Sequence, residues 1–367
     1  MPERSAHSGH HGVMPVIADA PGPDHPTAPP EPVDPARLYR DMAITRRIDT
    51  EAIALQRQGE LGLWPSLLGQ EAAQVGAAHA LQPQDMVFPT YREHGVAWVR
   101  GIDPVELLGL FRGTTLGGWD PQQHRMNTYT LVIGAQLLHA VGYAMGIVRD
   151  GDVGTGEPGR DRAVLAFLGD GSISEGETNE AFVWAAAQDL PVVFLCQNNQ
   201  WAISAPFSVQ SRVPVARRAD GFGFPGIRVD GNDVHAVLDA TREALERARA
   251  GGGPTLVEAL TYRRNPHTTS DDDGRYRSGA ENDRWAARDP LALALDGMET
   301  GDGRAALLAE VEQECEQVAA RLRAGCRALP EPDPAAPFDH TFAEITPELE
   351  RQRAEHLAFV ASLEVTP

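Results

Sequence analysis

The stretch "VLAFLGDGSISEGE", residues 164–177, begins as a run of apolar, β-prone residues and then enters Gly169-Asp170-Gly171. A strand that ends in a glycine-rich loop and continues into a helix is typical of a phosphate-binding site. A carboxylate at the centre of this loop would repel a free phosphate group. A divalent cation between the two would turn the repulsion into attraction, so the stretch predicts a metal-bridged phosphate site at Asp170.

The residues around this loop predict a complete βαβ unit. We expect a strand over residues 163–169, a helix over 174–188 and a second strand over 191–197. Because the crossover in such units is right-handed and the two strands are parallel, both strands end at the same edge of the sheet. Asp170 follows the first strand and Asn198-Asn199 follow the second. Their carboxylate and carboxamide oxygens are ligands that suit Mg²⁺.

The rest of the chain alternates short β-rich runs with longer helical patterns, as in "HAVLDATREALERARA" and "PTLVEALTY". This alternation predicts an α/β fold, with a mostly parallel sheet and helices on both faces. We expect a disordered, proline-rich leader over residues 1–33, an α/β domain over residues 34–290 and a helical C-terminal region over residues 291–367. The first helix is expected to begin at Asp34-Pro35 and to stop at Gly59.

The composition favours a cytoplasmic protein that binds neither nucleic acid nor membranes. The chain of 367 residues has 32 basic and 52 acidic residues, and its formal charge of -20 repels nucleic acid and anionic lipid. Its apolar runs are shorter than the ~20 residues of a membrane-spanning helix. The cysteines, Cys196, Cys315 and Cys326, are too few and too irregularly spaced for a disulfide framework or a zinc site, which fits a reducing compartment.

A dinucleotide-binding fold is the main competing interpretation, because it also places Gly-x-Gly after a strand. Its fingerprint Gly-x-Gly-x-x-Gly needs a third glycine at position 174, where this chain has Ser174. The acidic residue between the first two glycines would also face a pyrophosphate without a metal ion to neutralise it. A nicotinamide-dependent oxidoreductase is therefore a remote alternative.

Several motifs together resemble the alpha subunit of the thiamine-diphosphate-dependent decarboxylating component of 2-oxo acid dehydrogenase complexes, of the branched-chain and pyruvate types. The segment "GDGSISEGETNEAFVWAAAQDLPVVFLCQNNQWAIS" is similar to the thiamine-diphosphate motif of this family. The similarity continues through "LGQEAAQVGAAHAL", "PTYREHGVAWVRG", "QLLHAVGYAMG", "YRRNPHTTSDDDGRYR" and "PFDHTFAEITPELERQR". It spans roughly residues 36–360 and implies that residues 34–290 adopt the thiamine-diphosphate-binding fold.

The resemblance implies a site in which Mg²⁺ and thiamine diphosphate bind together. Asp170 and Asn199 would contribute side-chain oxygens to Mg²⁺, and the backbone carbonyl of Trp201 would be a third protein ligand. The residues implied to bind the cofactor are Tyr91, Arg92, Ile133, Gly169, Asp170, Gly171, Ser172, Asn199, Arg263 and His267.

The resemblance also implies individual roles within this set. Tyr91, Arg92 and Arg263 would hold the diphosphate, since guanidinium groups form bidentate, charge-assisted bonds to phosphate. Ile133 would be the bulky aliphatic residue that forces the two rings of the cofactor into a bent shape. His267 would donate or accept a proton beside the substrate carbon, and an imidazole that titrates near neutrality suits this work.

The implied reaction is the oxidative decarboxylation of a 2-oxo acid, followed by acyl transfer to lipoyl groups. The chain has residues for only one of the two domains of this general fold that the family's site needs. The resemblance therefore implies a separate beta subunit, an α₂β₂ heterotetramer and a lipoylated acyltransferase core as partners. A branched-chain acid such as 3-methyl-2-oxobutanoate is the favoured substrate and pyruvate the alternative, with Leu63 and Trp64 as candidate residues of the substrate pocket.

A non-catalytic scaffold subunit is a second remote alternative. It would require a broken metal site, but Asp170, Asn199, Arg92, Arg263 and His267 are all present.

Overall fold

The computed structural model describes residues 33–364 apart from positions 116, 158, 299 and 340. The described residues all belong to one structural unit, which begins at Val33. No helix within the described residues is both long enough and apolar enough to cross a membrane. The expected leader, residues 1–33, lies outside the described residues except for Val33.

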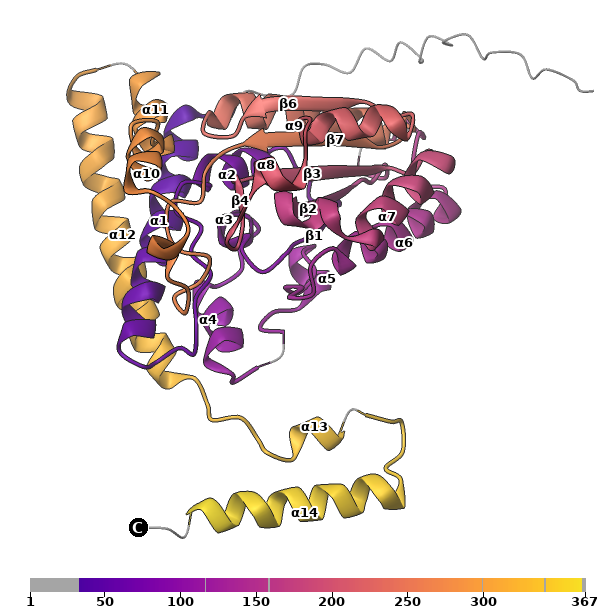
Figure 1. Cartoon of the computed structure of the whole chain (residues 1–367), viewed down its shortest axis with the longest axis vertical. Helices are drawn as coiled ribbons and strands as arrows, with labels where there is room; N and C mark the ends of the chain where they lie inside the picture. The colour runs from indigo at the N-terminus through magenta and orange to yellow at the C-terminus, as the bar shows by residue number, and fades with distance from the viewer. Residues whose placement is uncertain (1–32, 116, 158, 299, 340, 365–367) are drawn as a thin grey trace, which may run out of the picture. The chain divides into compact units, whose positions relative to one another are not determined.

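The centre of the fold is a five-stranded parallel sheet with the strand order β1-β2-β3-β7-β6 (Figure 1). β4 and β5 form a short antiparallel ribbon after β3. The strands are β1 (Met86–Phe88), β2 (Val164–Gly169), β3 (Val192–Asn198), β4 (Trp201–Ala202), β5 (Ala205–Pro206), β6 (Gly226–Asp230) and β7 (Thr255–Leu260).

Helices precede, connect and follow the strands. The first seven in the described residues are α1 (Pro35–Arg57), α2 (Glu71–His79), α3 (His94–Val99), α4 (Pro104–Arg112), α5 (Pro121–His124), α6 (Ala135–Asp150) and α7 (Gly176–Ala187). The later ones are α8 (Phe207–Gln210), α9 (Val234–Arg249), α10 (Gly279–Ala286), α11 (Pro290–Asp296), α12 (Asp302–Ala328), α13 (Ala336–Asp339) and α14 (Pro347–Glu364). Short 3-10 helices cover Asp170–Ser174, Val215–Gly221 and Asp273–Arg275. The expected α/β fold class is confirmed.

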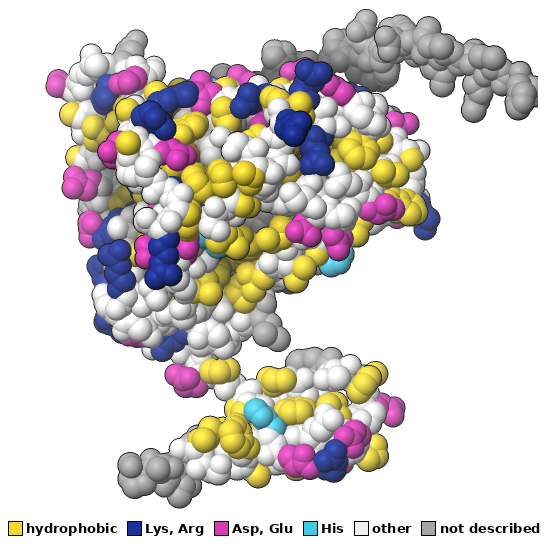
Figure 2. Space-filling model, in the orientation of Figure 1, with side chains coloured by type: hydrophobic (Ala, Val, Ile, Leu, Met, Phe, Trp, Pro, Cys, Tyr) yellow, Lys and Arg dark blue, Asp and Glu magenta, His cyan; other side chains and the backbone are white. Residues whose placement is uncertain are grey.

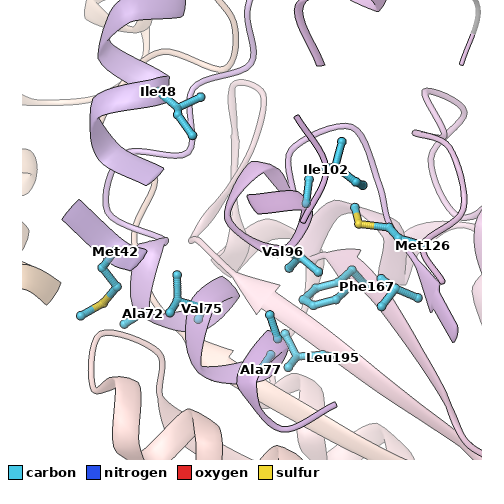
Figure 3. Close-up of a cluster of buried hydrophobic side chains, with 14 of the residues drawn as sticks. Met42, Ile48, Ala72, Val75, Ala77, Val96, Ile102, Met126, Phe167 and Leu195 are labelled. Atoms are coloured by element: carbon cyan, nitrogen blue, oxygen red, sulfur yellow. The ribbon is translucent and has the colours of Figure 1, made fainter. Parts of the chain in front are cut away.

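The sheet is buried on both faces, because successive side chains of its strands enter two different hydrophobic clusters. Phe167 and Leu195 belong to the cluster formed with α1, α2, α3 and α9 (Figure 3). Leu168 and Phe194 point the other way, into the cluster formed with α6 and α7. This is why the strands read as continuous apolar runs rather than as alternating apolar and polar residues.

The βαβ unit predicted around Asp170 is present, with one insertion at its turn. β2 and β3 pair in parallel over the expected segments. The helix expected over 174–188 is shorter, because Asp170–Ser174 form a 3-10 helix and α7 begins only at Gly176. The residues directly after β2 are therefore those of a tight turn, not of the long helix.

The first helix begins and ends where the sequence predicts. The Asp34 side chain accepts a hydrogen bond from the Ala36 backbone N–H, and Pro35 occupies the first turn. The apolar face of α1 packs on α12, whose Leu322 and Cys326 are fully buried in the same cluster. Part of the C-terminal helical region thus completes the core around α1.

Acidic and basic side chains are interspersed on the face shown in Figure 2, where arginines lie beside aspartates and glutamates. Ion pairs also join α1 to α12, such as Arg40 with Glu310 and Arg47 with Glu316. Exposed pairs of this kind contribute at most about 1 kcal/mol each, so the apolar contact determines how α12 packs.

Candidate functional site

The candidate site lies at the carboxyl ends of four neighbouring strands. Arg92 follows β1, Asp170 follows β2, Asn199 follows β3, and Arg263 and His267 follow β7. Their side chains line a cavity of about 280 Å³. Ligands of open parallel sheets bind at this edge, because the loops that follow the strands converge there. All eleven residues that the resemblance implied for cofactor and metal line this cavity.

Asp170 is a buried carboxylic acid at the first position of the 3-10 helix, with 1% of its surface exposed. Burial raises its pKa from the ordinary value of 3.8 to about 6, although the positive charge of Arg263 and the backbone N–H of Asn199 oppose the increase. Among the described residues, the Asp170 carboxylate has one side-chain hydrogen-bond partner, the Gln210 amide, at a long distance of 3.4 Å. A carboxylate buried with so little compensation favours a cation at this position.

The other two proposed metal ligands adjoin Asp170. The Asn199 carboxamide oxygen accepts a hydrogen bond of 3.3 Å from the backbone N–H of Trp201 and retains a second lone pair. The carbonyl of Trp201 accepts a bond of 3.0 Å from Arg263, which likewise leaves one lone pair.

No group of three or more His, Cys, Asp or Glu side chains gathers for a metal ion within the described residues. A cation here would therefore rely on one carboxylate, one carboxamide, one carbonyl and oxygens from the ligand. Such a donor set, made only of hard oxygens and incomplete on the protein side, fits Mg²⁺ bound with a diphosphate.

The two glycines of the Gly-Asp-Gly loop differ in what an added side chain would contact. A Cβ atom on Gly171 would lie 2.9 Å from the Cβ of Ala202, so glycine here allows the turn to pack against β4. A Cβ on Gly169 would meet open space, which is compatible with the expected close approach of a ligand to the backbone. Ser172 is buried, and its carbonyl accepts a hydrogen bond of 2.6 Å from Thr178 of α7.

The two arginines differ in how many of their N–H groups are already used. Arg92 donates to the carbonyls of Ser66 and His267, contacts the His267 ring and lies over the Tyr91 ring, and it has no other hydrogen-bond partner among the described residues. At least one of its N–H groups is therefore available to an anion.

Arg263 is 1% exposed, and its guanidinium donates to the carbonyls of Trp201, Ile203 and Asn265 and contacts His267 and Tyr276. Burial and the nearby Arg92 lower its pKa to about 10, so Arg263 remains cationic at neutral pH. Arg263 thus contributes its charge to the cavity while its hydrogen bonds hold the backbone around β4.

The expectation that His267 titrates near neutrality is not met. Burial, followed by the charges of Arg92 and Arg263, lowers its pKa from 6.5 to about 3, so the imidazole is neutral at pH 7. Guanidinium groups of both arginines lie 3.3 Å from Nδ1. Because guanidinium groups only donate, Nδ1 must be the acceptor and Nε2 must carry the proton. His267 therefore presents an N–H donor, 3.5 Å from the hydroxyl of Tyr91.

Ile133 lies at the wall of the cavity and is 39% exposed, so it is not a core residue. It belongs to a turn before α6 that also exposes Leu131 and Val132. Leu63 and Trp64 do not line the cavity. Trp64 is fully buried, stacks on His94 with ring centroids 4.1 Å apart, and donates a hydrogen bond of 2.8 Å to Asp49.

Sequence reasoning missed several polar residues of the cavity wall, among them Gln70, Thr90, Glu93, Gln136 and Gln197. Gln197 directly precedes the Asn-Asn pair, so its place at the strand end could have been anticipated. Gln70 and Gln136 adjoin helix starts far from the motif, and nothing in their spacing pointed to the site.

The fold and this cavity define an α/β protein with a polar ligand site at the ends of its parallel strands. The family model described as "Dehydrogenase E1 component" matches residues 39–321, and the chain belongs to this family. The resemblance in sequence is thereby confirmed.

Three relatives illustrate the range of the family. The chain is 47% identical to the 3-methyl-2-oxobutanoate dehydrogenase subunit alpha of Mycobacterium tuberculosis, over 88% of this chain and 87% of that protein. It is 36% identical to the pyruvate dehydrogenase E1 component subunit alpha of Acholeplasma laidlawii, over 88% and 93% of the two chains. The corresponding pyruvate dehydrogenase subunit of Staphylococcus aureus is 38% identical over 69% and 67%.

Proposed function

We propose that this chain is the alpha subunit of a branched-chain 2-oxo acid dehydrogenase, which decarboxylates an acid of the 3-methyl-2-oxobutanoate type and transfers the acyl group to lipoyl groups. The observation that carries the proposal is the convergence of Arg92, Asp170, Asn199 and His267 on one cavity in a member of this family. The 47% identity to a 3-methyl-2-oxobutanoate dehydrogenase subunit supports the choice of substrate.

Proteins of this family depend on thiamine diphosphate. We assign its diphosphate and a Mg²⁺ ion to the cavity at the strand ends. Asp170, Asn199 and the Trp201 carbonyl would hold the metal, and Arg92 would donate directly to the diphosphate. The bound cofactor supplies the electron sink that decarboxylation of a 2-oxo acid requires.

The remaining residues orient the ligand and control protons. Ile133, partly exposed at the cavity wall, supports the cofactor from one side. Neutral His267 presents its Nε2–H as a hydrogen-bond donor in the cavity, 3.5 Å from the Tyr91 hydroxyl. An anionic diphosphate near Arg92 would offset one of the charges that keep the pKa of His267 low, which would make the imidazole easier to protonate.

The alpha subunit of such a component is expected to pair with a beta subunit. We propose an α₂β₂ heterotetramer that serves a lipoylated acyltransferase core, because the relatives of this chain are named as alpha subunits of such enzymes. We also propose a cytoplasmic location, which the free thiols of Cys196, Cys315 and Cys326 support.

Pyruvate is the second candidate substrate, because relatives of 36% and 38% identity are named pyruvate dehydrogenase subunits. One or two methylene groups in an apolar pocket change discrimination by only about 1 to 3 kcal/mol each. The free energies with which the enzyme binds the transition states of the two substrates therefore differ by only a few kcal/mol, so the substrates are compared by their kcat/KM values.

The test is to co-express the chain with a candidate beta subunit and to compare kcat/KM for 3-methyl-2-oxobutanoate and pyruvate with an artificial electron acceptor. We expect a preference for the branched acid of about 10-fold or more, dependent on Mg²⁺ and thiamine diphosphate and lost in Asp170→Ala. Turnover that survives Asp170→Ala would refute the metal assignment. A clear preference for pyruvate would refute the proposed substrate.

A further inference from the structure

The orientation of the Asn199 carboxamide is set by two neighbours. Its oxygen accepts a hydrogen bond from the Trp201 backbone N–H at 3.3 Å, and its nitrogen donates to the Gln70 carboxamide oxygen at 3.1 Å. Only this arrangement pairs donors with acceptors on both sides, because a backbone N–H cannot accept. Without Gln70 the Asn199 amide nitrogen would lose its acceptor, and only the Trp201 N–H would hold the carboxamide in this rotation.

Gln70 accepts this bond while its own amide nitrogen is left unpaired among the described residues. Its side chain is fully buried. A buried donor without an acceptor is destabilising, and a methionine of similar length would fill the same space without it. Packing alone therefore does not explain a glutamine at this position.

A hydrogen bond and a close backbone approach hold the segment that carries Gln70 against the end of β7. Gly69 has a φ of 95°, and a Cβ there would lie 2.3 Å from the Tyr262 carbonyl, so only glycine allows this approach. The Thr261 hydroxyl donates to the Gly69 carbonyl at 2.6 Å, and the Gly69 N–H donates to Glu71 at 2.9 Å. A side chain on such a rigid segment holds its partner in a defined position.

We propose that Gln70 is a positioning residue for the metal site, which fixes the rotation of the Asn199 carboxamide and with it the direction of the oxygen that would bind the metal. The inference rests on the proposed function, because it assumes that Asn199 binds Mg²⁺. Outer residues that orient metal ligands typically change metal affinity by about 10- to 100-fold when they are replaced. Gln70 acts through Asn199 and does not touch the metal.

The test measures binding of Mn²⁺, as a probe for Mg²⁺, in the presence of thiamine diphosphate, by electron paramagnetic resonance on the full chain co-purified with its beta subunit. We expect Gln70→Met to weaken Mn²⁺ binding by about 10-fold or more. Gln70→Glu keeps an acceptor for the Asn199 amide and should bind Mn²⁺ at least as tightly as the wild type. The melting temperature of each variant without ligands reports any general loss of structure.

A double-mutant cycle separates positioning from packing. In an Asn199→Ala background, Gln70→Met should cause no further loss of Mn²⁺ affinity, because the residue that it positions is absent. Unchanged binding in Gln70→Met, or an equal loss in both backgrounds, would overturn the inference while leaving the proposed function intact. Failure of the wild type to bind Mn²⁺ with thiamine diphosphate would overturn the proposed function and, with it, this inference.

Discussion

The chemistry of single residues in this chain depends strongly on what surrounds them, and His94 illustrates this. It is fully buried at the start of α3, with Nδ1 2.7 Å from the Tyr129 hydroxyl and Nε2 3.1 Å from the Pro65 carbonyl. Burial, together with the charge of Arg92, lowers its pKa from 6.5 to about 3. Between pH 6.5 and about 3, the His94 imidazole is therefore protonated in the unfolded chain but neutral in the folded protein.

This difference predicts a contribution to acid sensitivity. As pH falls from 6.5 toward 3, His94 should lower the free energy of unfolding by up to about 1.4 kcal/mol per pH unit, whereas above pH 6.5 it has no effect. His94→Gln should reduce that slope in urea titrations at several pH values. The exposed His235→Gln is the control and should keep the wild-type slope; equal slopes in all three proteins would contradict the explanation.

Substitution of Arg92 should mainly weaken cofactor binding, whereas substitution of Arg263 should mainly destabilise the fold. Arg92→Lys removes N–H groups available to an anion and should weaken thiamine diphosphate binding by about 10-fold, the equivalent of one charge-assisted hydrogen bond. Arg263→Lys removes bonds to three carbonyls, so it should lower the melting temperature of the ligand-free protein more than Arg92→Lys does. Calorimetric titration and thermal melts measure the two effects, and the reverse ranking in melting temperature would count against these roles.

At the scale of elements, close contact between helices explains why some helical glycines are required and others are not. Gly76 lies in α2 where it packs on α9, and a Cβ there would be 2.6 Å from the Val234 carbonyl and 3.1 Å from the Val237 side chain. Gly142 lies in α6, where a Cβ would meet no atom within 4 Å.

The same substitution should therefore have opposite effects at the two positions. Gly142→Ala should stabilise the isolated chain by about 0.5 to 1 kcal/mol, the usual gain in helix propensity. Gly76→Ala gains the same propensity but must separate α2 from α9, and we expect a net loss of about 1 to 3 kcal/mol. Denaturant unfolding of both variants checks this, and stabilisation by Gly76→Ala would show that the α2–α9 contact is not tight.

At the scale of the whole molecule, the C-terminal helices differ in what they contribute to the core. α12 buries Val311, Leu322 and Cys326 against the cluster that includes α1. In contrast, α14 leaves Phe359 and Leu363 each 61% exposed.

This difference predicts the result of truncation. A chain that ends at Leu329 keeps α12 and should melt within a few degrees of the full chain. A chain that ends at Gly301 loses α12, and with each large apolar side chain worth about 1.5 to 3 kcal/mol, its melting temperature should fall by roughly 10 °C or more. Circular dichroism during heating distinguishes the two cases; similar melting of both truncated chains would mean that α12 does not stabilise the fold.

Local patterns in the sequence are enough to predict the α/β class and to place Asp170 and Asn199 at one sheet edge. These features depend on local periodicity and on the handedness of a βαβ unit, which short stretches of chain contain. The family resemblance then brought Arg92, Arg263 and His267 to the same site.

How these residues act depends on contacts that exist only in the folded chain. Gln70 and Asn199 are 129 positions apart and Arg92 and His267 are 175 apart, so their contacts leave no local pattern. The neutral state of His267, the occupied bonds of Arg263 and the burial of Trp64 depend on how deeply each group is enclosed and which charges face it. Burial and distant neighbours are properties of the folded chain, because desolvation and Coulomb interaction depend on distances in space and not along the sequence.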